Sequence, residues 1–164
     1  MMRKTIMAAV VASSLWAGGA IAQTCGAPGS WQPNDAGTPT LPGDTCAGSD
    51  DIALYCGALN STGKLDAVYQ VTFAAAGTAT SVTVGGGAAG FDPIVAIYSG
   101  GCATGDGCVA SGEPSLAMDV SGVADGTYFL GVTAAPPNAA GACGAFVLTA
   151  DGSFPVALQN FSVE

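Results

Sequence analysis

From residue 65 onward the chain repeats one feature, an alternation of apolar and polar side chains with a period of two. Tyr69 and Val71 fall on one face of an extended run, and Gln70 falls on the other. The same period returns in short runs separated by glycine or aspartate, at residues 81–84, 116–120, 128–132 and 146–150. Residues 94–98 are apolar on both faces, which predicts a strand that is central in its sheet or covered by loops. The pattern predicts an all-β fold, an antiparallel β-sandwich of jelly-roll-like form.

The amino end has the three parts of a secretory signal peptide. Arg3 and Lys4 give a positive start, an apolar stretch too short to span a bilayer follows, and Ala20-Ile21-Ala22 supplies the small residues of a cleavage site. We therefore predict that residues 1–22 are a signal peptide and that the mature chain is secreted or periplasmic. A retained signal anchor is the alternative.

The predicted mature chain divides into three parts by composition. Residues 23–42 are rich in Pro, Gly, Asn and Thr, which predicts an extended arm. Residues 43–151 contain the alternating runs and form the predicted sandwich. Residues 152–164 form a tail in which Pro155 starts an amphipathic stretch. We expect this tail either to close the sandwich as an edge strand or to pair with a partner as a detachable strand.

All six cysteines lie after the predicted cleavage point, and an even number in an exported chain indicates disulfides. Six cysteines allow about 15 pairings, and the sequence does not choose among them. Our hypothesis combines two local bridges with one that ties the amino end to the last hairpin: Cys46 with Cys56, Cys102 with Cys108, and Cys25 with Cys143. A zinc site is the alternative, but it would have neither C-x-x-C spacing nor histidine.

The charge of the predicted mature chain is almost entirely negative. The whole sequence holds 12 Asp and Glu against 3 Lys and Arg, for a formal net charge of −9. Removing residues 1–22 leaves Lys64 as the only base, and the net charge becomes 1 − 12 = −11. One lysine cannot neutralise the phosphates of a nucleic acid or of an anionic membrane. We therefore expect no nucleic-acid partner, and no membrane partner after signal cleavage.

Groups suited to catalysis are scarce in this sequence. It contains no histidine, which excludes histidine-based triads and histidine-ligated metals. A serine nucleophile would depend on Lys64, which we expect in an exposed turn. Two carboxylates could hydrolyse a glycosidic bond, and Asp92 with Glu113 is the least implausible pair. Because turn chemistry explains most of these acids, we expect no enzymatic activity; a small carboxylate-dependent hydrolase is the alternative.

Two kinds of ligand contact stay open at this point. Calcium takes oxygen ligands from scattered loops, and Asp44, Asp51, Asp66 and Asp92 are the best positions for them. The sequence has no EF-hand loop and no glycine-rich calcium repeat, so solvated loop acids are the competing interpretation. Trp31 is the only tryptophan after residue 22, and it could stack on a ligand or fill the edge of the core.

Several runs, taken together, resemble the bacterial pre-peptidase C-terminal domain family. They are Gly43-Asp44-Thr45-Cys46, the stretch 66–73, Phe91-Asp92-Pro93 with Ile97-Tyr98-Ser99-Gly100 and Cys102, Gly126-Thr127-Tyr128-Phe129-Leu130-Gly131-Val132, and the stretch 144–149. Their order and spacing match over about residues 43–151. The resemblance implies a jelly-roll-like β-sandwich found as a non-catalytic module on secreted bacterial enzymes, commonly proteases.

Some relatives in that family bind calcium or polymers such as collagen or polysaccharide. The resemblance therefore implies a secreted bacterial module that binds an extracellular polymer or protein, with calcium as a possible stabilising ion. A structural or adhesion subunit that assembles through its terminal strand is the alternative from another functional class.

Overall fold

The computed structural model describes residues 23–32, 40–52, 54–56, 59–60, 62–74, 78–86, 91–102, 107–113, 116–137 and 142–152. The predicted signal peptide and residues 153–164 of the predicted tail lie outside this part of the chain. The elements are β1 (Gly29–Ser30), β2 (Thr40–Asp44), η1 (Thr45–Ala47), β3 (Leu54–Tyr55), β4 (Leu59–Asn60), β5 (Ala67–Phe73), β6 (Ser81–Gly86), β7 (Pro93–Tyr98), β8 (Cys108–Gly112), β9 (Met118–Asp119), β10 (Gly126–Ala134) and β11 (Ala145–Asp151).

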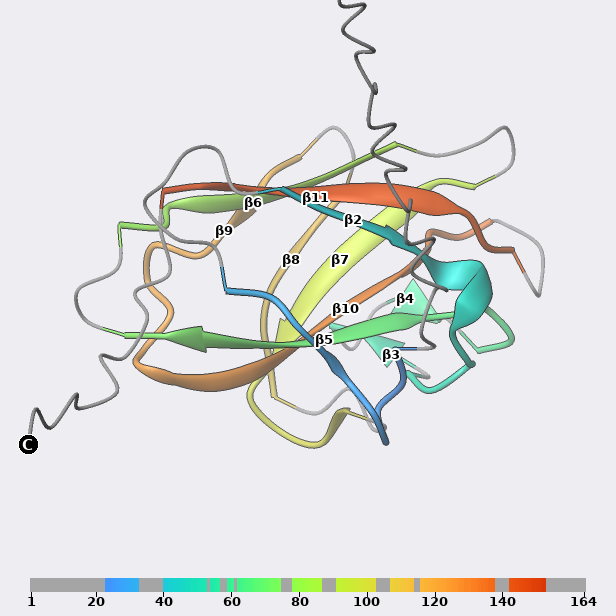
Figure 1. The fold of residues 1–164 in the computed structure, drawn as a ribbon, viewed down its shortest axis with the longest axis horizontal. Helices are drawn as coiled ribbons and strands as arrows, with labels where there is room; N and C mark the ends of the chain where they lie inside the picture. The colour runs from blue at the N-terminus through green and yellow to red at the C-terminus, as the bar shows by residue number, and fades with distance from the viewer. Residues whose placement is uncertain are drawn as a thin grey trace, which may run out of the picture.

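Two sheets form the layers of a sandwich, so the predicted all-β class is confirmed. One sheet has the order β1-β5-β10-β7-β8 and the other β2-β11-β6-β9, while β3 and β4 make a small separate pair. Figure 1 shows β6 and β11 along one layer and β5 and β10 along the other. Every strand pair within the two sheets is antiparallel except β1 with β5, which is parallel.

The main core lies between the sheets and follows the predicted alternation. Tyr69 and Val71 of β5 point inward with Leu130 of β10, and they meet Phe146 and Leu148 of β11. The Tyr69 and Phe146 rings make an edge contact across the sandwich, with centroids 6.4 Å apart. Burial of alternate side chains is the main stabilising contribution in such a sandwich.

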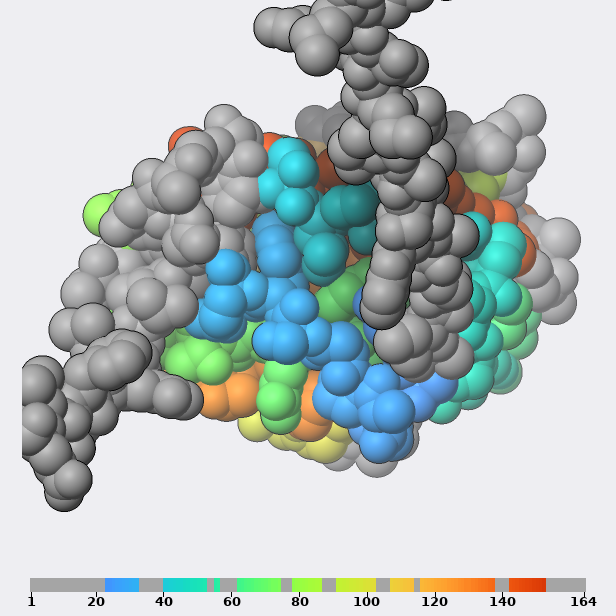
Figure 2. Space-filling view, in the orientation of Figure 1, coloured from blue at the N-terminus to red at the C-terminus, as the bar shows by residue number. Residues whose placement is uncertain are grey.

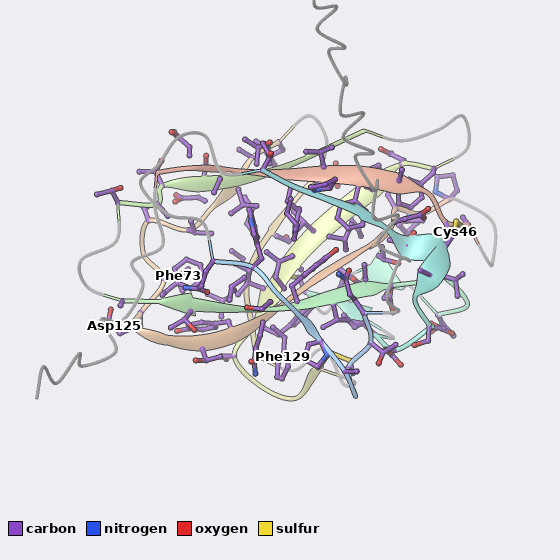
Figure 3. The ribbon with its side chains drawn as sticks, viewed as in Figure 1. Cys46, Phe73, Asp125 and Phe129 are labelled. Atoms are coloured by element: carbon purple, nitrogen blue, oxygen red, sulfur yellow. A yellow bond between two sulfur atoms is a disulfide. The ribbon has the colours of Figure 1, made fainter. Side chains whose placement is uncertain are left out.

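A second core lies on the outer face of the five-stranded sheet. All six residues of β7 are buried, and Ile94, Ala96 and Tyr98 face away from the main core. Figure 3 shows the two sides of this sheet, with Phe73 directed toward the other sheet and Phe129 on the opposite side. The strand predicted at 94–98 is thus both central, between β10 and β8, and covered on its outer face.

Residues 23–32 belong to the sandwich, which begins earlier than the boundary expected at residue 43. The Val68 N–H donates to the Gln23 carbonyl at 2.9 Å, and the Trp31 N–H donates to the Gln70 carbonyl at 3.1 Å. Figure 2 shows this segment, in blue, lying against the green surface of β5. Beyond the segment, β2 starts at Thr40, inside the range expected to be an arm.

The last residue of this N-terminal segment completes the edge of β5 with its side chain. The Gln32 Nε2 donates to the Thr72 carbonyl at 3.2 Å, and the Thr72 N–H donates to the Gln32 Oε1 at 2.9 Å. A side-chain amide has the same donor and acceptor pair as a peptide group. Gln32 therefore occupies backbone groups that an open edge strand would otherwise present to other chains.

The expected disulfide pairing is wrong at all three bridges. The structure joins Cys25 to Cys102, Cys46 to Cys143 and Cys56 to Cys108. Each bond links a cysteine of the first part of the chain to one of the last part, with sequence separations of 77, 97 and 52. In the chain-entropy description, a loop of this size corresponds to roughly 4 to 5 kcal/mol per bond.

The pairing of β2 with β11 shows why local bridges do not form. Asp44 lies opposite Ala145, so Cys46 and Cys143 meet just beyond the ends of these strands. The Gly144 N–H also donates to the Thr45 Oγ1 at 3.1 Å, which fixes the junction. Strand register, a long-range property, therefore selects the cysteine partner.

Candidate functional site

The most unusual polar group in the described structure is Asp66, immediately before β5. Its side chain is fully buried, and its Oδ2 accepts the N–H groups of Asp51 at 2.9 Å and Ile52 at 2.7 Å. The Asp66 N–H in turn donates to the Ser49 carbonyl at 2.8 Å. Asp66 thus fixes the start of residues 49–56, which we call the covering segment. The structure describes residues 49–52 and 54–56 of this segment.

The covering segment lies over the second core and requires glycine in the sheet beneath it. Ile52 and Tyr55 are 0% and 1% exposed. A Cβ on Gly131 would come within 2.5 Å of the Ile52 Cδ1 and 2.8 Å of the Tyr55 Oη. Just before the segment, a Cβ on Gly48 would overlap the Asp66 carbonyl oxygen. The segment therefore packs directly on the backbone of β10 and of the residue before β5.

Two further contacts fasten the covering segment. Cys56 is bonded to Cys108 of β8. The Asp51 Oδ2 accepts the Cys25 N–H at 2.8 Å and the Ser49 hydroxyl at 2.9 Å. Since Cys25 is bonded to Cys102, the N-terminal segment and the covering segment are tied to each other and to the sheet.

Burial changes the acid–base properties of this region. Desolvation raises the pKa of Asp66 from 3.8 to about 6, although the Ile52 and Asp51 N–H groups and the Thr133 hydroxyl oppose the rise. Burial also raises the pKa of Tyr55 and of Tyr98, and the nearby Asp66 charge adds to both shifts. Both phenols stay neutral near pH 7, while Asp66 is mostly ionised.

Other acids accept hydrogen bonds from groups in turns. The Asp44 Oδ1 accepts the Cys46 N–H at 2.8 Å as the N-cap of η1, and the Asp50 Oδ2 accepts the Gly63 N–H at 2.7 Å. The Asp119 Oδ1 accepts the hydroxyl and N–H of Ser121, which lowers the pKa of Asp119. Such contacts are typical of aspartate in turns.

The structure brings two of the four predicted calcium positions together and not the whole set. The Asp66 carboxylate accepts the backbone N–H of Asp51, whereas Asp44 caps η1 and Asp92 is exposed before β7. Over the residues described, no three Asp, Glu, Cys or His side chains are placed to hold a metal ion. Asp92 and Glu113, the pair considered for the hydrolase alternative, are both exposed.

Two other sequence-based expectations are corrected by burial. Trp31 is 5% exposed and packs in the main core, so its ring fills the edge of the sandwich and is not presented for stacking on a ligand. Lys64 is 6% exposed, although the turn predicted around it is present and Gly63 has a φ of +84°. The Asp50 Oδ2 accepts the Gly63 N–H at 2.7 Å, which ties this turn to the covering segment.

The outer face of the four-stranded sheet differs from the covered face in being exposed. We call its central residues the open face: Thr40, Pro42, Thr83, Gly85, Val147 and Thr149. Thr149 lies opposite Thr40 and Thr83, and Val147 lies opposite Pro42 and Gly85. These side chains are short and uncharged, and Val147 is 40% exposed. Among the described residues of this face, charges lie at strand ends, at Asp44 of β2, Asp119 of β9 and Asp151 of β11.

Comparison with protein-family models, with curated proteins and with solved structures finds no match. The class that can be stated is therefore structural: an all-β sandwich with three disulfides. Such bonds persist in oxidising compartments outside the cytosol. No helix in the described part of the chain is long and apolar enough to cross a membrane.

Proposed function

We propose that this chain is a secreted or periplasmic bacterial β-sandwich module that binds an extracellular polymer or protein and has no catalytic role. The observation that carries the proposal is the difference between the two outer faces. One is covered by a segment held by a buried aspartate and a disulfide, and the other presents the open face. A broad uncharged surface on a strongly acidic protein suits contact with a partner.

The chemistry of the acids supports binding over catalysis. Asp44 and Asp119 accept backbone N–H groups in their own turns, and Asp50 accepts one from the turn at Gly63. Asp66 accepts two more inside the protein. A carboxylate used in this way has fewer free lone pairs for a substrate. The sequence resemblance to the pre-peptidase C-terminal domain family adds a jelly-roll-like topology and a polymer-binding role to the proposal.

The open face also suggests the kind of partner. Its charged ends are acidic, so a polyanion such as a nucleic acid would be repelled. Threonine hydroxyls can donate and accept hydrogen bonds, and the valine and threonine methyl groups add apolar contact. A neutral polysaccharide or a protein surface with hydroxyl and amide groups fits these properties.

The test is co-sedimentation of the oxidised mature protein, residues 23–164, with insoluble cellulose, chitin or collagen. Val147→Glu places a charge in the centre of the open face and should weaken binding at least tenfold. Val109→Glu is the matched control, because Val109 is also 40% exposed but lies on β8. If both variants bind equally well, the open face is not the binding surface. If the protein hydrolyses a polymer and Asp92→Asn abolishes this activity, the non-catalytic role is wrong.

A further inference from the structure

Four buried side-chain oxygens near the covering segment have no partner at full hydrogen-bond geometry in the structure. They are the Tyr55 Oη, the Asp66 Oδ1, the Tyr98 Oη and the Thr133 Oγ1. Each of these residues is at most 1% exposed. They come from four different places: the covering segment, the residue before β5, β7 and β10. The Thr133 hydroxyl and the Cys56 backbone lie near enough to lower the pKa of Asp66 and of Tyr98, but neither contact meets that geometry.

The fold brings these residues to one region of the outer sheet face. Ala67 lies opposite Val132, so the next residues along the ladder, Asp66 and Thr133, are neighbours on the face that holds the second core. The Thr133 hydroxyl is close enough to lower the pKa of Asp66. Tyr55 lies over Gly131, two residues before Thr133 on the same face.

Tyr98 completes the group from the adjacent strand. Its ring makes an edge contact with the Tyr55 ring, with centroids 5.9 Å apart. The Asp66 charge contributes to the raised pKa of both tyrosines, which is consistent with the position of all three residues on the outer face of the sheet. The charged and titratable groups around this region also include Asp50 and Asp51 of the covering segment and Lys64 before β5.

We propose that Tyr55, Asp66, Tyr98 and Thr133 enclose a binding site for one water molecule that joins the covering segment to the sheet. Native proteins seldom leave buried polar atoms unsatisfied, and enclosed waters typically make about three hydrogen bonds to such atoms. Here the water links the segment to β5, β7 and β10, which makes it part of the attachment of the segment.

The balance of hydrogen atoms selects water over a cation. The four oxygens offer three O–H donors, while the Asp66 Oδ1 only accepts. A water molecule donates to the Asp66 Oδ1 and to the Thr133 hydroxyl oxygen, and it accepts from the two tyrosine hydroxyls. The Thr133 hydrogen is then free to point to the Asp66 carboxylate, whose pKa this hydroxyl lowers. A sodium ion would satisfy the carboxylate but could accept none of the three hydroxyl hydrogens. The site thus matches a guest that both donates and accepts.

The direct test is to detect the water in the oxidised mature protein. Oxygen-17 relaxation dispersion should show a long-lived internal water, and a high-resolution crystal structure should place it within hydrogen-bond distance of at least three of the four oxygens. A dry site overturns the proposal. The proposal is also overturned if the site holds a cation. A cation would show short distances to its oxygen ligands in the crystal structure and a higher melting temperature in sodium chloride than in choline chloride.

A second test uses the sign of a stability change. Thr133→Val keeps the shape of the side chain and removes its hydroxyl. If that hydroxyl binds water, the unfolding equilibrium constant should rise about fivefold or more, and the water signal should weaken. If the hydroxyl has no partner, its removal should lower that constant. Thr40→Val on the exposed edge strand β2 is the control and should change neither quantity.

Discussion

The pKa of Asp66 leads to a measurable dependence of stability on pH. The folded value of about 6 lies above the ordinary value of 3.8, so the folded protein binds this proton more tightly than the unfolded chain does. The contribution to stability is fully present below about pH 4 and is lost as the pH rises through about 6. The difference between the folded and the ordinary pKa of Asp66 corresponds to about 3 kcal/mol in the free energy of unfolding, since one pKa unit is about 1.4 kcal/mol.

Asp66→Asn isolates this contribution, because the amide oxygen can still accept the N–H groups of Asp51 and Ile52 but does not titrate. We expect wild type to gain stability relative to the variant by about 2.5 kcal/mol between pH 7.5 and pH 4, and by about 3 kcal/mol at still lower pH. Urea unfolding with intact disulfides, repeated at several pH values, measures the difference.

Asp119→Asn provides a control of opposite sign. The pKa of Asp119 is lowered by Ser121, so its contribution is present above the ordinary aspartate pKa and is lost as the pH falls. A stability difference between wild type and Asp66→Asn that stays constant with pH would refute the reasoning about the buried carboxyl.

Three other predictions test the packing and the covalent framework. After removal of residues 1–22, Lys64 is the only residue after which trypsin can cut, and because it is buried the folded protein should resist cleavage. If the chain is cut there, the two fragments should stay together on a non-reducing gel, because all three disulfides join residues before Lys64 to residues after it. Peptide mapping should give the same three disulfides. Gly131→Ala should destabilise by about 1 to 3 kcal/mol because Ile52 and Tyr55 must move, whereas Gly122→Ala, with nothing within 4 Å, should be nearly neutral in urea unfolding. Trp31→Ala should destabilise by about 3 to 5 kcal/mol by leaving a cavity in the main core, and an unchanged unfolding midpoint would show that the N-terminal segment is dispensable.

The candidate site could be predicted only in part from the sequence. Asp51 and Asp66 stood out as acids near each other along the chain, and the structure does bring them together. Their use is different from the calcium role expected, because Asp66 binds backbone N–H groups of the covering segment. Tyr55 and Thr133 gave no signal, since an isolated tyrosine and a strand threonine occur in most β-proteins. Their significance arises from their shared position.

The sequence by itself determined where most of the strands lie and that the charged side chains are almost all acidic. Alternation of side chains is a local property, because adjacent residues of any strand point to opposite faces, so Tyr69, Val71 and their counterparts could be assigned to the core in advance. The absence of histidine from the sequence, and of arginine after residue 22, needed no fold either.

Only the tertiary structure decided the disulfide partners, the burial of Lys64 and the covering of one sheet face. These depend on which distant segments meet, and that is set by strand order and register across the whole sandwich. Cys46 lies ten residues from Cys56 but bonds to Cys143, because β2 pairs with β11 and the backbone brings those ends together.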